Sequence, residues 1–163
     1  MSIKAKLLLS LALLREFHNK VEYYKSVVKR NVHIYKGYKM QSSDSGKVRA
    51  IEREIAGLEN IYRQLDNISI FLEYIILRLE TLITANNVTV SIAMMRDVVK
   101  VLKNNTSKTI PILTTLVDRL DELTRTLVSE TQSSFQSKNV VNTASLEAKK
   151  IVEEAKKVAG VQQ

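Results

Sequence analysis

Residues 48–83 carry apolar side chains at alternating steps of three and four residues, and this regularity constrains the fold more than any other feature. The mean spacing of 3.5 residues keeps one stripe on one face of an α-helix and is typical of coiled-coil packing with a left-handed twist. Ser69 is the only polar member of this seam, which otherwise consists of Val48, Ile51, Ile55, Leu58, Tyr62, Leu65, Leu72, Ile76, Leu79 and Ile83. A helix with such a stripe needs a partner that covers it.

The preceding segment supplies that partner. Apolar residues recur at steps of three and four over residues 2–40, from Ile3 to Tyr38. The run QSSDSG at 41–46 then breaks the pattern with a glycine and with side chains that compete with helical hydrogen bonds. Only four glycines and one proline occur in 163 residues, which disfavours a β-rich fold. We therefore predict an all-α protein built on a long antiparallel helical hairpin over residues 2–86.

Shorter periodic segments follow the hairpin. Asn86 and Asn87 are expected to interrupt the helix or act as a hinge. Two shorter helices are predicted within 88–130, the second with Pro111 in its first turn. Residues 131–142 are polar and aperiodic, which predicts a linker. A last amphipathic helix is predicted over 143–160, where Gly160 ends it. The expected organisation is a helical core over 1–130, a linker and a C-terminal helix.

The positive charge of the chain is placed unevenly. Residues 1–50 hold eleven Lys and Arg against three acids, whereas the remainder holds fourteen of each, giving a net charge of +8. Such a basic, elongated segment on a neutral body is typical of proteins that bind a polyanion, either nucleic acid or an anionic membrane face. The hairpin as a whole keeps a surplus of five, with fourteen basic and nine acidic residues in 1–86.

A column of acids flanks the apolar seam of the second long helix. It repeats every seven residues and consists of Glu52, Glu59, Asp66, Glu73 and Glu80, which we call the acidic column. Flanking charges of this kind set partner choice and orientation in coiled coils. The acidic column can pair with the basic residues of the first helix in the same hairpin or with those of a neighbouring copy, and the sequence leaves both open.

No residues with catalytic or metal-binding spacing are recognised. The chain lacks cysteine, which excludes disulfides, thiolate metal sites and a cysteine nucleophile. His18 and His33 lie fifteen residues apart on one predicted helix, so they cannot both bind one metal at i, i+4 spacing. We expect no acid at ligand spacing from either and interpret both as structural or surface histidines. Phosphate-binding glycine loops, nucleophile elbows and HExxH pairs are absent. We therefore expect no enzymatic activity, no cofactor and no bound metal.

Three stretches resemble the ESCRT-III family, in particular its archaeal, CdvB-type cell-division branch or a viral homologue of it. They are FLEYIILRLETLI at 71–83, VVKVLKN at 98–104 and IPILTTLVDRLDELTRTL at 110–127, set in a basic first helix and a heptad-rich second helix. The resemblance covers residues 1 to about 130. It implies an ESCRT-III-like fold and a subunit that polymerises into filaments on anionic membranes for constriction or scission in cell division or budding.

The resemblance also implies roles for residues. The cations expected to face anionic lipid are Lys4, Lys6, Arg15, Lys20, Lys25, Lys29, Arg30, Lys36 and Lys39. The expected hairpin and polymer interface consists of Glu52, Ile55, Leu58, Glu59, Tyr62, Leu65, Asp66, Leu72, Glu73, Ile76, Leu79 and Glu80. By the same resemblance the C-terminal helix is hypothesised to fold back on the hairpin as an autoinhibitory element.

The implied partners are further copies of the chain, paralogous ESCRT-III subunits, an anionic membrane and an AAA+ ATPase. The tail that the ATPase would bind is missing or atypical here, because the sequence reaches Gln163 without the family's proline-flanked motif. The expected location is cytoplasmic and peripheral, on the inner face of the cell membrane. No apolar stretch reaches the roughly 20 residues that span a bilayer, since Glu73, Arg78 and Glu80 interrupt the most apolar region.

Two other functions are compatible with the residues. A basic helical nucleic-acid-binding protein would show the same charge asymmetry. Against it, the cations are mixed with a regular acidic column and no helix-turn-helix or zinc module is recognised, so a nucleic-acid partner is not expected. A coiled-coil adaptor that dimerises through residues 48–83 is the other alternative.

Overall fold

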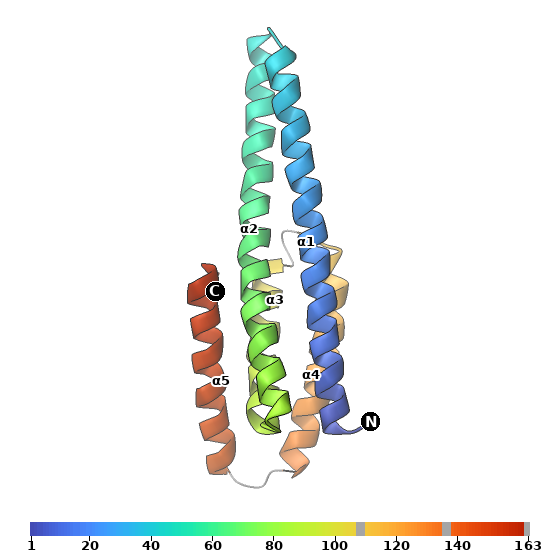
Figure 1. Cartoon of the computed structure of the whole chain (residues 1–163), viewed down its shortest axis with the longest axis vertical. Helices are drawn as coiled ribbons and strands as arrows, with labels where there is room; N and C mark the ends of the chain where they lie inside the picture. Colours follow the sequence, from blue (N-terminus) through green and yellow to red (C-terminus); the bar gives the residue numbers. More distant parts are fainter. Residues whose placement is uncertain (107–109, 135–137, 162–163) are drawn as a thin grey trace.

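The computed structural model describes residues 1–106, 110–134 and 138–161, with the side chains of 132–141 excepted. The prediction of an all-α fold with a long N-terminal hairpin is confirmed, and no strand occurs among the described residues. The five helices are α1 (Ile3–Gln41), α2 (Ser45–Thr84), α3 (Val88–Thr106), α4 (Leu113–Ser134) and α5 (Lys138–Ala159). Figure 1 shows α1 and α2 as two long antiparallel rods with the shorter helices gathered at one end.

Local hydrogen bonds fix the ends of the hairpin helices. The Ser2 hydroxyl accepts from the backbone N–H of Ala5 at 3.1 Å and caps α1, and the Asp44 carboxylate accepts from the Gly46 N–H at 2.9 Å and caps α2. Side-chain oxygens at these positions satisfy donors that have no partner within the helix. The reversal predicted at 41–46 is therefore shorter than expected, because the Asp44 cap lets α2 begin at Ser45.

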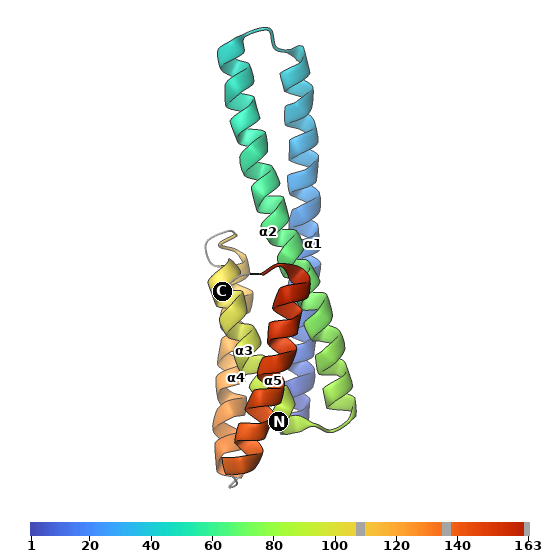
Figure 2. The same cartoon turned by 90° about the vertical axis from the view of Figure 1, so that its left-hand side faces the viewer.

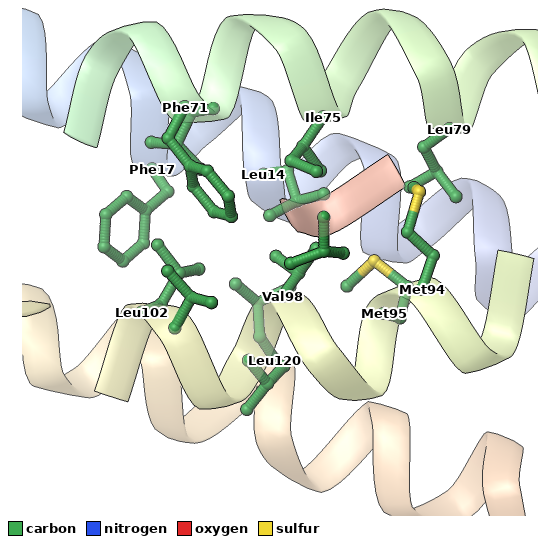
Figure 3. Close-up of a cluster of buried hydrophobic side chains, with 14 of the residues drawn as sticks. Leu14, Phe17, Phe71, Ile75, Leu79, Met94, Met95, Val98, Leu102 and Leu120 are labelled. Carbon is green, nitrogen blue, oxygen red and sulfur yellow. The ribbon is translucent and has the colours of Figure 1, made fainter. Parts of the chain in front are cut away.

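The three later helices cover only the half of the hairpin that holds the N-terminus and the end of α2. In Figure 2, α3, α4 and α5 lie beside this half, and the other half stands clear of them. We call the covered part the body. Its core combines α1 residues such as Leu14 and Phe17 with side chains of the other helices, and Figure 3 shows this cluster. The labelled members from the other helices are Phe71, Ile75, Leu79, Met94, Met95, Val98, Leu102 and Leu120.

The rest of the hairpin is a two-helix extension. Gly160, which directly follows α5, lies beside Asn67 of α2: a Cβ placed on this glycine would be 3.9 Å from the Asn67 side-chain amide. The end of α5 therefore reaches the level of Asn67. Lys25 pairs with Asp66 at the same level of the hairpin, so residues 26–63 lie beyond it, and we call them the free half. Val28 and Ile55 are the buried residues there. Two helices cover each other's seam from one side only, so the remaining seam residues stay half-buried or exposed.

The later helices differ in their bounds from the sequence prediction. Asn86 and Asn87 do separate α2 from α3, with Asn86 in the left-handed region at φ 57°, which Asn tolerates better than most residues. Pro111 lies in a turn just before α4 rather than in its first helical turn. The linker predicted at 131–142 is too long: α4 continues to Ser134 and α5 begins at Lys138. Polar residues lower helix propensity by only fractions of a kcal/mol, which adjoining helices can override.

Candidate interaction surface on the helical hairpin

Every member of the acidic column lies opposite a basic or histidine side chain of α1. The pairs are Arg15–Glu80 at 2.7 Å, His18–Glu73 at 3.2 Å, Lys25–Asp66 at 2.8 Å, Lys36–Glu59 at 3.6 Å and Lys39–Glu52 at 3.2 Å. The two residue numbers of each pair add to 91 or 95, as one antiparallel register requires. Both partners belong to one chain. Of the two pairings that the sequence left open, this structure has the one inside the hairpin.

We call these five pairs the ion-pair row, and their side chains differ in exposure. In the outer pair Lys36–Glu59 both side chains are more than half exposed, at 59% and 51%. Pairs of this kind contribute about 0.2–1 kcal/mol at most, so their main effect is on register. The Lys25 side chain is only 13% exposed and packs over the Tyr62 ring, with its ammonium 5.6 Å from the ring centroid. The middle of the hairpin therefore holds the strongest ionic contact of the row.

The apolar residues expected at the interface pack within the chain. Ile55, Leu65, Leu72 and Leu79 are buried. Leu58, Tyr62 and Ile76 are half-buried and pack against the same core. These residues therefore form the hairpin itself in this structure. A contact of the same residues with a second copy stays a prediction.

Six of the nine cations expected to face lipid are engaged inside the chain. Arg15, Lys25, Lys36 and Lys39 belong to the ion-pair row. Lys4 donates a hydrogen bond to the Asn86 side chain at 3.3 Å, and Lys6 pairs with Glu130 of α4. The other three, Lys20, Lys29 and Arg30, are exposed and make no ion pair with any described residue. The basic face of α1 is thus much less available than its sequence suggests.

Sequence reasoning missed a group of cations on α2. Lys47, Arg49, Arg53 and Arg63 are exposed and have no ion pair within the described part of the chain. All four lie at heptad positions outside the apolar seam and the acidic column. Their heptad positions could therefore have predicted from the sequence that they face outward. Together with two cations of α1 they form the group that we call the free-half cations: Lys29, Arg30, Lys47, Arg49, Arg53 and Arg63.

The free half holds a large share of the chain's surplus charge. Residues 26–63 contain eight Lys and Arg and four Asp and Glu, a net charge of +4 out of +8 for the chain. Exposed apolar and aromatic side chains lie near the same end: Met40 is 89% exposed, Tyr38 55% and Ile34 43%. The Tyr38 ring meets the Tyr35 ring edge-on, with centroids 6.2 Å apart. This end of the molecule combines cations with side chains suited to a membrane interface.

A polar cluster surrounds Ser69, the one polar residue of the α2 seam. Ser69 is buried, with 1% of its surface exposed. Its hydroxyl donates to the Glu22 carboxylate at 2.5 Å and lies 3.1 Å from Nε2 of His18. The Ser69 hydrogen bond lowers the pKa of the Glu22 carboxyl despite the opposing effect of burial, and the nearby Lys25 and His18 add to this lowering. Burial opposes the charge on Lys25, but hydrogen bonds to Asp66 and Glu22 outweigh it and raise the Lys25 pKa.

The prediction that no acid lies at ligand spacing from His18 is wrong. Glu22 lies one turn after His18, and its Oε1 is 3.7 Å from the imidazole Nε2. Glu73 of α2 brings a second carboxylate oxygen to 3.2 Å from the same nitrogen. The Glu22 spacing was readable from the sequence, whereas the approach of Glu73 required the register of the hairpin. His33 is exposed.

Helix α5 covers the face formed by α2 and α3. Its apolar stripe is buried there: Ala144, Ala148, Ile151, Val152, Ala155 and Ala159. The Tyr74 hydroxyl of α2 donates to the Glu154 carboxylate at 2.9 Å, and this hydrogen bond raises the pKa of Tyr74. Arg96 of α3 reaches the Ser145 hydroxyl at 3.5 Å. The last helix is therefore docked on the body through a packed apolar stripe with polar contacts at its edges.

No protein-family model matches the chain, and no solved structure matches it. Among the described residues, no helix is both long and apolar enough to cross a membrane.

Proposed function

We propose that the chain is a membrane-remodelling polymer subunit that assembles into filaments on anionic membranes, as its resemblance to the ESCRT-III family implies. The observation that carries the proposal is the free half, with its net charge of +4 and its six cations free of ion pairs among the described residues. The surface that contacts lipid is revised accordingly. It is centred on the free-half cations rather than on the whole basic face of α1.

The charge of one copy supports only weak binding. Each Lys or Arg near an anionic membrane surface contributes about 1 kcal/mol. A net charge of +4 then gives about 4 kcal/mol, which corresponds to a dissociation constant near 1 mM. Copies linked in a polymer bind with much higher avidity, because each further contact is made at high effective concentration. Self-association and membrane binding therefore belong together in the proposal.

Exposed side chains near the loop add to the membrane contact. Met40, Tyr38 and Ile34 lie in the same half as the free-half cations. Tyrosine places an apolar ring and a polar hydroxyl at a membrane–water interface, and lysine and arginine keep their charged ends in water while their stems cover apolar surface. We propose a peripheral location on the cytoplasmic face of the cell membrane, because that leaflet carries the anionic lipids that attract such cations.

The remaining parts of the proposal concern regulation and partners. Docked α5 hides the α2–α3 face, so its release would expose an apolar stripe to a second copy or to a paralogous subunit. In the proposed autoinhibition, α5 holds the subunit in the unassembled form, and a partner AAA+ ATPase acts on the polymer. Deleting residues 131–163 is expected to increase filament formation. Unchanged assembly of the shortened chain would contradict autoinhibition.

Sedimentation with liposomes tests the membrane proposal. The wild-type chain is expected to pellet with anionic liposomes, not with neutral ones, and to form filaments visible by negative-stain microscopy. Neutralising Lys29, Arg30, Arg53 and Arg63 to Gln should abolish pelleting. A control variant carries four Gln at exposed cations of α3 and α5, namely Lys100, Lys149, Lys150 and Lys157. Both variants have the same net charge, so the control should still pellet.

Other results would favour the alternatives. Equal loss of pelleting in both variants would show that total charge, and not the free half, governs lipid binding. Tight, salt-dependent binding to duplex DNA or RNA without lipid affinity would favour a nucleic-acid-binding protein. A stable dimer that binds neither lipid nor nucleic acid would favour a coiled-coil adaptor.

A further inference from the structure

Three potential ligand atoms converge at the polar cluster between α1 and α2. They are Nε2 of His18 and carboxylate oxygens of Glu22 and Glu73, all within 4.8 Å of one another. Two of them come from one turn of α1 and the third from the facing helix α2. The buried hydroxyl of Ser69 lies beside them and holds Glu22 by a hydrogen bond at 2.5 Å. The group is thus positioned by the register of the hairpin and by a seam residue.

The spacing of these atoms suits a small divalent cation. Zinc binds imidazole nitrogen and carboxylate oxygen at about 2.0–2.2 Å, and tetrahedral ligands at that distance lie about 3.3–3.5 Å apart. In the structure, Nε2 of His18 is 3.2 Å from Oε1 of Glu73 and 3.7 Å from Oε1 of Glu22. These two distances are within a few tenths of an ångström of that spacing, and the two carboxylate oxygens lie within 4.8 Å of each other, so side-chain rotation of Glu22 and Glu73 would bring the three ligands together. Three protein ligands leave a fourth position for water.

The charges of the cluster also favour a cation. Two carboxylates face one imidazole nitrogen, and that nitrogen can hold one proton or donate one lone pair. The Lys25 ammonium lies 3.3 Å from Oε2 and 3.4 Å from Oε1 of Glu22, but it has a closer partner in Asp66 at 2.8 Å. It can therefore keep its ion pair when Glu22 turns towards a metal. We propose that His18, Glu22 and Glu73 form a zinc-binding site that links the two helices of the hairpin.

A metal at this position would act on the fold as a cross-link. It would join α1 to α2 within the body, about two helical turns from the Lys25–Asp66 level at which the free half begins. Because the complete ligand set exists only when the hairpin is in register, zinc binds the folded chain in preference to the unfolded one and stabilises it by mass action. The site is independent of the proposed membrane function and uses none of the free-half cations.

Zinc titration of the metal-free full-length chain tests the proposal. Calorimetry at neutral pH in a non-chelating buffer is expected to show one zinc ion per chain, and thermal unfolding should shift to higher temperature with zinc but not with magnesium. The background is low, because the chain has no cysteine and only one other histidine. Glu73→Gln, at a side chain 57% exposed, removes one ligand with little risk to folding and should weaken binding at least tenfold.

Two further variants complete the test. His18→Gln should also weaken zinc binding at least tenfold. His33→Gln is the matched control, since His33 is exposed on the same helix. It should bind zinc like the wild type. The absence of a zinc-dependent shift in the wild type, equal affinity in His18→Gln and wild type, or loss of binding in His33→Gln would each overturn the proposed site. Circular dichroism of the metal-free variants separates loss of a ligand from loss of the fold.

Discussion

The ion-pair row allows a quantitative comparison of one half-buried and one exposed pair in the same hairpin. The perturbations are two double-mutant cycles. One replaces Lys25 by Met and Asp66 by Asn, and the other replaces Lys36 by Met and Glu59 by Gln. Each cycle isolates the interaction between its two residues from their other contacts, provided that the single variants form no new ones.

The structure predicts different coupling energies for the two pairs. For Lys25–Asp66, at 2.8 Å with the lysine 13% exposed, the direct attraction is about 6 kcal/mol at an effective dielectric constant of 20. Desolvation and loss of side-chain freedom offset most of it, leaving about 1.5–2 kcal/mol, the lower part of the range measured for hydrogen bonds to charged groups. For Lys36–Glu59, at 3.6 Å with both groups largely exposed, the attraction in water is about 1 kcal/mol. Ordering two long side chains leaves at most about 0.3 kcal/mol.

Urea unfolding followed by far-ultraviolet circular dichroism measures both couplings. Repeating the cycles in 1 M salt, where the Debye length is about 3 Å, should abolish the Lys36–Glu59 coupling and retain more than half of the Lys25–Asp66 coupling. Equal couplings in the two cycles would refute the assignment of the stronger contact to the middle of the hairpin. So would a Lys25–Asp66 coupling below about 0.5 kcal/mol, the level typical of exposed pairs.

Three further predictions concern pH, backbone conformation and packing. The pKa of Glu22 is lowered, so the ionised carboxylate stabilises the fold fully above about pH 4.5, the ordinary pKa of the group. This stabilisation is lost as pH falls through the lowered pKa. The gap in Tm between wild type and Glu22→Gln should therefore close on acidification, and a constant gap would contradict this. Gly160→Ala should lower the free energy of unfolding by about 1 kcal/mol because of its φ of +68°, whereas Gly57→Ala, in open space on α2, should raise it by up to about 1 kcal/mol. Urea unfolding reports both, and changes of equal sign would be inconsistent with these conformations. Leu102→Ala should cost roughly 2–5 kcal/mol in the same assay, against less than about 0.5 kcal/mol for Leu77→Ala at a residue 66% exposed; similar costs would contradict the position of the core.

The repeating features of the sequence predicted the hairpin well. The seam of 48–83 could be recognised because every step of three or four residues is local, and local periodicity requires no knowledge of the partner. The same holds for the acidic column. Whether Glu59 pairs with its own chain or with a neighbour is a non-local property, and both solutions satisfy the same heptad pattern. The short reversal that begins after Gln41 brings α2 back along α1 and sets their register, and in this register Glu59 pairs within its own chain.

Single contacts across the hairpin were harder to predict. The approach of Glu73 to His18 joins residues far apart in the chain, and it follows only once the register is known. The same register removed Lys36 and Lys39 from the candidate membrane surface by pairing them internally. A variant that reverses the charge of these lysines would therefore disturb the hairpin as well as any lipid contact, and Arg53 and Arg63 are better targets for testing membrane binding.

The sparse burial of the free half has a consequence for motion. With Val28 and Ile55 as its buried residues, this part can open locally without unfolding the body, and its backbone amides are expected to exchange with solvent faster than those around Leu72. The free half contains residues 26–41 of α1 and 45–63 of α2, and at about 1.5 Å per residue it extends roughly 25 Å from the body. Small changes in the crossing angle of its two helices therefore move the loop by several ångströms at little energetic cost. In the proposed membrane contact, this freedom lets the charged end follow surfaces of different curvature while the body keeps its shape.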